Sequence, residues 1–350
     1  MLNDRQNQAV HYIQGPLLVL AGAGSGKTRV ITEKIAYLIR QQIYTARQIG
    51  AVTFTNKAAK EMKERIAQTL PKAQLRGLTV CTFHTLGLNI IRRELSTLGF
   101  KPGFSLFDDQ DTYALLNALT EDVFEGDKAL IQACQHQIGH WKNAMLSPEL
   151  ALQKAGNDQE KAFAQVYQQY QNNLSACNAV DFDDLIRLPT QLLATNENAR
   201  ARWQKKFQYL LVDEYQDTNT SQYQLVKLLV GERARFTVVG DDDQSIYSWR
   251  GAQPKNLALL KQDFPQLDVV KLEQNYRSHG RILKAANILI ENNPHVFEKK
   301  LFSEMQYGEP ISVIFGRNEE HEAERVVAEI VKQRFLRKTP YHHFAILYRG

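Results

Sequence analysis

A glycine-rich turn between an apolar segment and a helical segment constrains this chain more than any other stretch. Residues 18–30 read LVLAGAGSGKTRV. Glycine tolerates positive φ and lets a ligand approach the backbone closely, so successive N–H groups can converge on phosphate oxygens. The N-terminus of the following helix adds partial positive charge at the same place. The stretch therefore predicts a binding site for the phosphates of a nucleoside triphosphate.

Within this turn, Lys27 is expected to reach the β- and γ-phosphates, and the Thr28 hydroxyl is expected to help hold Mg²⁺. Ala21 stands where the strict form of the motif has glycine, so the match is to a looser form. Apolar residues at helical spacing over 31–39 supply the helix that the motif requires. The residues whose backbone would surround the phosphates are Ala23, Gly24, Ser25 and Gly26.

Composition excludes several other classes of protein. No segment approaches the ~18 consecutive apolar residues of a membrane span, and the N-terminus lacks the pattern of a signal peptide, so a cytoplasmic protein without a membrane partner is expected. Cys81, Cys134 and Cys177 are far apart and predict neither a disulfide framework nor a zinc site. The formal charge of +5 permits a polyanionic partner without requiring one.

Strand-like and helix-like segments alternate over residues 1–85 and again from about 181, which predicts an α/β fold with a parallel sheet. The segment 86–179 is rich in glutamine, alanine and leucine without a strand pattern, so we expect a helical insertion. A further unit should contain strands at 311–315 and 344–348 around a helix at 319–335; such a sheet would be incomplete, which predicts the front portion of a longer protein. The main sheet is expected to use 17–20, 50–54, 78–82, 209–212, 236–239 and 269–272.

Two acid-rich turns follow apolar segments and are expected at the carboxyl edge of the sheet, where open parallel sheets bind ligands. We assign Asp213 to the metal and Glu214 to the attacking water, although an acidic loop without chemistry is the alternative. Gln244 follows the next strand and is a candidate sensor of the γ-phosphate. Arg277, at the start of the second α/β unit, could stabilise phosphate charge. Tyr276 beside it could stack on adenine or lie in the core.

Hydroxyl, amide, cationic and aromatic side chains follow other strand ends, as in channels that bind single-stranded nucleic acid. Phe54 and Trp249 are candidates for stacking on bases, with a core position as the alternative for Trp249. For Lys57, an ordinary solvated charge on a helix is the alternative to a phosphate contact. The candidate nucleic-acid contacts are Thr53, Phe54, Asn56, Lys57, Thr82, Phe83, His84 and Trp249.

Taken in order, these segments resemble the motifs of superfamily 1 DNA helicases of the UvrD/Rep type. The segments that carry the resemblance are 21–30, 51–62, 82–85, 212–217, 239–252 and 272–278. Residues 104–111 and 293–301, outside the motifs, are similar to the Rep branch of that family. The resemblance implies that Gln6 reads adenine and that Arg29 contacts the nucleotide. It also implies a γ-phosphate sensor at Gln244, a phosphate contact at Arg277 and an adenine stack at Tyr276, and it places Phe54, His84 and Trp249 toward single-stranded DNA. With Lys27 and Glu214, assigned above, Gln244 and Arg277 are the candidate catalytic residues.

The resemblance further implies a RecA-like fold of two lobes, each interrupted by helices. On that basis residues 1–85 and 181–275 form the first lobe, 86–180 its helical insertion, and 276–350 the start of the second lobe. The expected function is ATP- and Mg²⁺-dependent translocation on single-stranded DNA with 3′ to 5′ unwinding. Expected partners are single-stranded DNA, its junctions with duplex, replication or repair proteins and a second copy of the chain, in the cytoplasm at the nucleoid.

The family's later motifs have no counterpart in these residues, which leaves two alternatives open. One is a module that binds ATP and single-stranded DNA without unwinding. The other is a helicase-nuclease subunit of the RecB kind.

Overall fold

The computed structural model describes residues 2–248, 251–253, 255–293 and 297–348. Its centre is a sheet of six parallel strands in the order β3-β2-β6-β7-β1-β8. Each strand lies where the sequence predicts one, which confirms the α/β class with a parallel sheet. The strands are β1 (Leu17–Ala21), β2 (Ile49–Thr53), β3 (Thr79–Thr82), β6 (Tyr209–Val212), β7 (Phe236–Gly240) and β8 (Asp268–Leu272).

The central strands are apolar throughout because both of their faces are covered. Every residue of β1 is buried, and the strand pairs in parallel with β7 on one side and β8 on the other. Alternate residues point to opposite faces, so Leu18 and Leu20 belong to one hydrophobic core while Leu17 and Val19 belong to the other. This double burial explains why the sequence shows short continuous apolar segments without alternation.

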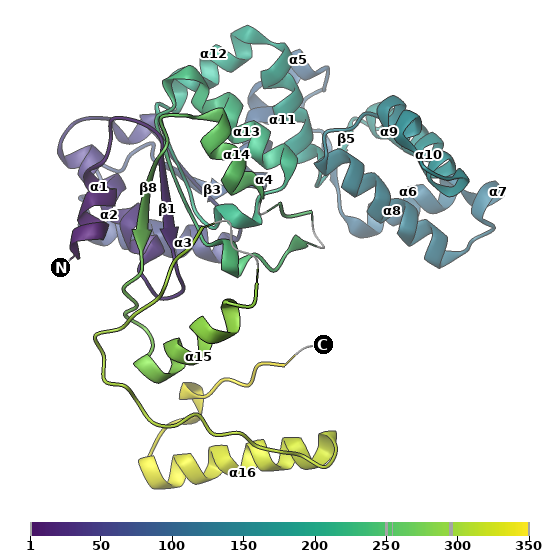
Figure 1. Cartoon of the computed structure of the whole chain (residues 1–350). Helices are drawn as coiled ribbons and strands as arrows, with labels where there is room; N and C mark the ends of the chain where they lie inside the picture. Colours follow the sequence, from purple (N-terminus) through teal and green to yellow (C-terminus); the bar gives the residue numbers. More distant parts are fainter. Residues whose placement is uncertain (1, 249–250, 254, 294–296, 349–350) are drawn as a thin grey trace.

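Helices cover the two faces as separate layers (Figure 1). On one face, α1 (Asp4–His11), α2 (Lys27–Arg40) and α3 (Asn56–Thr69) close one core. The helices of the other face are α4 (Phe83–Arg93), α11 (Asp184–Thr195), α12 (Glu197–Lys206), α13 (Thr220–Val230) and α14 (Lys255–Asp263).

A mainly helical unit projects from one side of the sheet (Figure 1). It has its own hydrophobic core, in which Trp141 stacks on Tyr167 at 6.0 Å between ring centroids. The expectation that this segment contains no strand is wrong, because β4 (Ser105–Phe107) pairs in parallel with β5 (Ala179–Asp181). Its helices are α6 (Asp109–Leu119), α7 (Glu121–Phe124), α8 (Lys128–Asn143), α9 (Pro148–Lys154) and α10 (Asp158–Ala176), whereas the short α5 (Leu95–Leu98) follows α4 and packs near α11.

A buried ion network joins this helical unit to the sheet layers. The ammonium of Lys142 in α8 is fully buried and lies 2.5 Å from an oxygen of Asp181 and 3.0 Å from an oxygen of Asp184 in α11. The Tyr170 hydroxyl donates a hydrogen bond to Asp181 at 2.9 Å. Burial raises the pKa of Asp184, but the charges of Lys142 and Arg187 outweigh it and lower that pKa to about 2.

Replacing Lys142 with methionine is expected to destabilise the protein by about 3 to 5 kcal/mol, because it leaves two buried carboxylates without their ammonium partner. Urea unfolding of the parent and the variant measures the difference. The matched control is Lys154→Met, since Lys154 is exposed at the end of α9. Equal stability of the two variants would contradict a stabilising role for the network.

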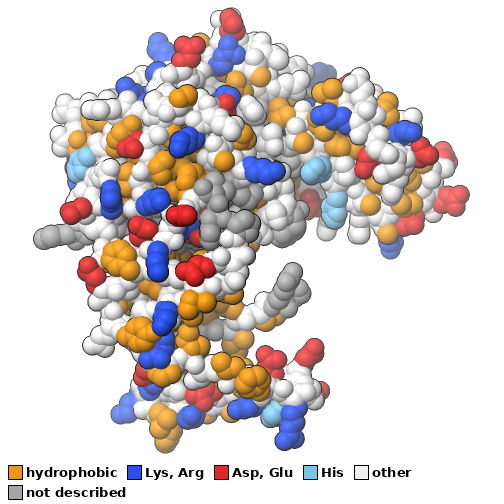
Figure 2. Space-filling view, viewed as in Figure 1, with side chains coloured by type: hydrophobic (Ala, Val, Ile, Leu, Met, Phe, Trp, Pro, Cys, Tyr) orange, Lys and Arg blue, Asp and Glu red, His pale blue; other side chains and the backbone are white. Residues whose placement is uncertain are grey.

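The last part of the chain contains α15 (Gly280–Ile290) and α16 (Glu319–Arg337). The helix predicted at 319–335 is confirmed, but the strands predicted at 311–315 and 344–348 are wrong, since the described residues there form no ladder. A strand needs a hydrogen-bonded neighbour, and the apolar side chains of these segments lie largely in solvent, with Phe315 at 77% and Leu347 at 94% exposed. Figure 2 shows hydrophobic side chains exposed over this part of the molecule. Among the described residues, every helix is too short or too polar to cross a membrane.

Candidate active site

Three side chains from three strand ends meet at the carboxyl edge of the sheet. The strands β1, β7 and β6 are neighbours and run in the same direction, so the turns that follow them lie side by side. The ammonium of Lys27 lies 2.8 Å from a carboxylate oxygen of Glu214 and 3.3 Å from the side-chain oxygen of Gln244. The fold therefore brings together the cation, the carboxylate and the amide that the sequence places far apart.

The turn after β1 has the backbone geometry of an anion cradle. Gly24 and Gly26 have φ values of 73° and 91°, which favour glycine. Gly26 is the residue before α2, and no side chain among the described residues caps that helix end. The first N–H groups of α2 lack partners within the helix and suit an anion. The Ser25 hydroxyl donates to the Gly22 carbonyl at 2.7 Å and fixes the shape of the turn.

The carboxylates after β6 differ in their surroundings. Asp213 is buried, and burial, followed by the charge of Glu214, raises its pKa to about 7. A divalent cation would favour the ionised form of this carboxyl group, so Asp213 and the Thr28 hydroxyl are a donor set that suits Mg²⁺. Glu214 is partly exposed and has a φ of 50°, an unusual backbone conformation for a residue other than glycine.

Gln216 is a residue of this site to which the sequence assigned no role. Its side-chain nitrogen donates to the Glu214 carboxylate at 3.0 Å, and its side-chain oxygen accepts from the Asp241 backbone N–H at 3.0 Å. Gln216 is buried in η2 (Tyr215–Asp217). It therefore ties the turn that carries Glu214 to the turn that carries Gln244, a role that depends on packing and leaves no signal in the sequence.

The residues expected to hold adenine lie around the same turn. The Gln6 side chain in α1 donates to the Ser25 carbonyl at 2.9 Å. The Tyr276 backbone N–H donates to the Gly24 carbonyl at 2.9 Å, and its hydroxyl accepts from Asn3 at 2.8 Å. The Tyr276 side chain is half exposed, so the alternative of a core tyrosine does not apply. Contact with a nucleotide stays a prediction for both residues.

The segment after β8 closes against the glycine-rich turn. The Asn275 side chain donates to the Ala23 carbonyl at 2.6 Å and accepts from the backbone N–H groups of Arg277 and Ser278. A Cβ atom at Gly24 would lie 2.7 Å from the Arg277 Cβ, so this glycine also permits the close approach of the two segments. Arg277 and Arg29 are both exposed at the rim of the site.

Lys299 is a second residue that sequence reasoning missed. Its ammonium lies 2.6 Å from Asp241, 2.8 Å from Asp242 and 2.6 Å from Asp243, and its side chain is 3% exposed. Burial lowers the pKa of Lys299, but hydrogen bonds to the three carboxylates raise it well above its usual range. These carboxylates lie in or beside η4 (Asp242–Gln244), and the Gln244 side chain donates to Asp241. Lys299 therefore fixes the turn that carries Gln244.

Replacing Lys299 with methionine is expected to destabilise the protein by about 3 kcal/mol, because the three carboxylates lose the ammonium that lies between them. Thermal unfolding measures this change, and Lys300→Met is the matched control because Lys300 is exposed. A melting temperature for the Lys299 variant equal to that of the control would show that the turn does not depend on this ion cluster.

The candidate nucleic-acid residues follow β2 and β3 at the same edge but differ in exposure. Phe54 is half-buried, and Asn56 and Lys57 are exposed at the start of α3. The side chain of Phe83, expected to face nucleic acid, is 1% exposed instead and packs edge-on against Phe54 at 5.4 Å between ring centroids. Because α4 begins at Phe83, this ring turns into the core.

The hydroxyl and imidazole groups of this edge also have structural partners. Thr53 and Thr82 are buried, and Thr82 caps α4 by accepting from the Thr85 N–H at 3.2 Å. Burial lowers the pKa of His84, whose ring lies 6.0 Å from that of Phe182. Trp249 lies outside the described residues, so its contact with nucleic acid stays a prediction, as do those of the other residues of this group.

Comparison with known proteins identifies the family. Residues 2–265 match the UvrD/REP helicase N-terminal domain, and residues 270–350 match the UvrD-like helicase C-terminal domain. The chain is 64% identical to the ATP-dependent DNA helicase Rep of Escherichia coli, over 100% of this chain and 52% of that protein. It is 42% identical to the ATP-dependent DNA helicase PcrA of Leuconostoc citreum, over 99% of this chain and 47% of that protein. The chain spans about half the length of the curated relatives it matches. The chain belongs to the UvrD/Rep helicase family.

Proposed function

We propose that this chain hydrolyses ATP and uses the reaction to move along single-stranded DNA in the 3′ to 5′ direction, as part of an ATP-dependent DNA helicase. The observation that carries the proposal is the meeting of Lys27, Glu214 and Gln244 beside an uncapped helix end. A cation, a carboxylate and an amide at a phosphate cradle are the groups that phosphoryl transfer to water requires. The direction of movement rests on the family alone.

In the proposed reaction the backbone N–H groups of the turn and Lys27 bind the β- and γ-phosphates, and Arg29 and Arg277 approach from the rim. Lys27 then exchanges the Glu214 carboxylate for phosphate oxygens. Because this exchange leaves Glu214 without its ammonium partner, Glu214 becomes the proton acceptor that orients the attacking water. Gln244, at 3.3 Å from Lys27, is placed to sense the γ-phosphate.

Thr28 and Asp213 would hold the Mg²⁺ that accompanies the nucleotide. When bound, the ion neutralises charge on the phosphate oxygens. Gln6 and Tyr276 would hold the adenine, since both lie against the glycine-rich turn. The hydrogen bond from the Tyr276 backbone to that turn gives the start of the proposed second lobe a direct route for responding to the nucleotide.

Single-stranded DNA would pass over the ends of β2 and β3. Phe54 is partly exposed and rests on the buried ring of Phe83, which suits it to stacking on a base. Asn56 and Lys57 lie exposed beside it and can contact phosphodiester oxygens. We place the protein in the cytoplasm at the nucleoid, with junctions between single-stranded and duplex DNA, replication or repair proteins and a second copy of the chain as further partners.

We also propose the division into a first lobe (1–85 and 181–275), a helical insertion (86–180) and the start of a second lobe (276–350). The separate hydrophobic core of the insertion supports this division. Packing favours a later start for the insertion, because Leu86 and Ile90 of α4 belong to the core of the first lobe. The insertion proper would then begin after α4.

An ATPase assay of the chain tests the proposed function. Phosphate release is measured in Mg²⁺ with no nucleic acid, with oligo-dT and with oligo-rU. Stimulation by oligo-dT is the expected result, and a weaker response to oligo-rU would identify DNA as the preferred polymer. If ATP binds but is not hydrolysed with any of them, the chain is a binding module and the proposed motor function is wrong.

A further inference from the structure

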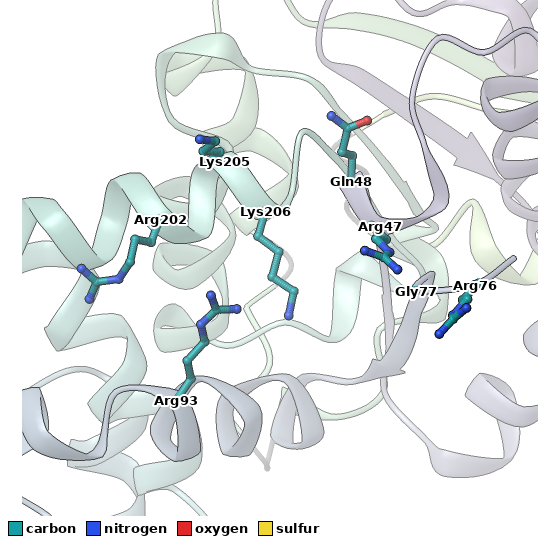
Figure 3. Close-up of a pocket in the computed structure, with 8 residues that line it drawn as sticks. All are labelled: Arg47, Gln48, Arg76, Gly77, Arg93, Arg202, Lys205 and Lys206. Atoms are coloured by element: carbon teal, nitrogen blue, oxygen red, sulfur yellow. The ribbon is translucent and has the colours of Figure 1, made fainter. Parts of the chain in front are cut away.

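A basic pocket lies at the amino edge of the sheet, opposite to the candidate active site. Its volume is about 680 Å³. Gln48 directly precedes β2 and Lys206 closely precedes β6, so the pocket lies where these strands begin, whereas Glu214 and Phe54 follow their ends. Figure 3 shows the residues that line it, which are Arg47, Gln48, Arg76, Gly77, Arg93, Arg202, Lys205 and Lys206.

The positive charge of this pocket is largely uncompensated. Arg202 pairs with Glu94 at 2.6 Å, and Glu94 is itself buried. Arg47, Arg76 and Lys205 are exposed and make no ion pair with any described residue. Arg93 and Lys206 extend toward each other in Figure 3, and both lie over the ring of Trp203. Burial and then the charge of Arg93 lower the pKa of Lys206, which agrees with a positive potential in the pocket.

Helix ends do not account for this cluster. Arg93 lies in the last turn of α4, and Lys205 and Lys206 lie in the last turn of α12, where cations stabilise the helix dipole. Arg76 lies in the turn before β3, outside any helix, and Arg47 comes from a further segment before β2. Separate parts of the chain thus deliver cations to one place, which points to an anionic ligand.

The pocket chemistry selects phosphate groups on an extended polymer. Arginine is prominent in the lining, and one planar guanidinium group can donate two parallel hydrogen bonds to two oxygens of the same phosphate. The charged side chains are mostly exposed and come from separate segments, as in surfaces that contact a backbone without reading bases. Duplex DNA carries one negative charge per ~1.7 Å of its axis, twice the density of one of its strands, so it offers the most phosphates to such a cluster of cations.

We propose that this basic pocket binds the phosphodiester backbone of duplex DNA, separately from the single strand at the carboxyl edge. This inference rests on the proposed function, because it assumes a protein that works at junctions. The strand β2 has five residues, so the two edges are about 16 Å apart at ~3.3 Å per residue. A second DNA segment can therefore occupy the amino edge while the first occupies the carboxyl edge.

The test compares two double variants that make the same change of charge. Arg47→Glu with Arg76→Glu alters the pocket, and Lys128→Glu with Lys154→Glu alters exposed lysines of the helical unit. Fluorescence anisotropy measures binding of a blunt duplex, of oligo-dT and of a poly-glutamate peptide to the full chain over a range of salt concentrations. ATPase activity with oligo-dT is measured on the same samples.

The pocket variant is expected to bind duplex about tenfold more weakly. Its plot of log affinity against log salt concentration should be less steep by about 1.8, since each of two lost phosphate contacts removes ~0.9. Oligo-dT binding and ATPase activity should be unchanged. Equal weakening by both double variants, or no weakening by the pocket variant, would overturn the proposal. So would unchanged duplex binding together with lost binding of a poly-glutamate peptide, since the partner would then be an acidic protein. A parent chain without ATPase activity would contradict the proposed function and leave the duplex measurement interpretable.

Discussion

Lys27→Ala should abolish ATP hydrolysis, with a fall in rate of at least ~10² to 10³-fold, the usual cost of removing one group that stabilises transition-state charge. The Lys27 ammonium donates hydrogen bonds to both Glu214 and Gln244, so its loss removes the cation between them. Phosphate release with oligo-dT measures the rate, and a fluorescent nucleotide measures ATP affinity, which should fall as well.

The fold of the Lys27 variant should survive, because Glu214 is partly exposed and can be solvated once its partner is removed. Its melting temperature is therefore expected to match that of Lys154→Ala, an exposed control on α9. Turnover near the parent rate in a folded variant would contradict the assignment of the cradle.

Glu214→Gln should stop hydrolysis while nucleotide binding is kept. The amide has the shape of the carboxylate but cannot take a proton from water, and loss of a general base costs about 10² to 10⁴-fold. The glutamine oxygen can still accept from Lys27 and from Gln216, so the turn should hold its shape. Single-turnover hydrolysis and nucleotide binding measured together separate this variant from Lys27→Ala, which should lose both.

Asp217→Asn is the matched comparison for Glu214→Gln. Burial, followed by the charge of Glu214, raises the pKa of Asp217 to about 6, so this carboxyl group is also a conceivable base. We expect the Asp217 variant to keep most of its activity, because the structure places Glu214 and not Asp217 at Lys27. If the Asp217 variant is inactive and the Glu214 variant active, Asp217 and not Glu214 is the base.

The sequence predicted the main sheet and the meeting of the candidate site residues at its carboxyl edge, because both follow from local patterns. Apolar segments such as 209–212 become buried parallel strands, and parallel strands place the turns that follow them at one edge. Once Lys27 and Glu214 are assigned to such turns, their proximity is a consequence of the topology. Their contact at 2.8 Å agrees with this reasoning.

Local sequence patterns do not predict contacts between segments that are far apart in the chain. Lys299 has no feature that distinguishes it from Lys300 beside it, and only the folded chain brings it to the three aspartates. Phe83 and Phe54 both follow a predicted strand, so the sequence does not distinguish them. In the structure α4 begins at Phe83, and its ring is buried in the core. The segments 311–315 and 344–348 have the composition of strands and no hydrogen-bonded neighbour among the described residues.

The left-handed backbone of Glu214 has a consequence for protein engineering. A residue with a Cβ atom in this region of φ costs about 1 to 2 kcal/mol, and glycine does not carry that penalty. Selection for thermal tolerance alone would therefore favour glycine at position 214, and under the proposed mechanism the resulting protein would be robust but unable to hydrolyse ATP. Libraries built to raise the melting temperature of this chain should hold position 214 fixed or be screened for turnover as well.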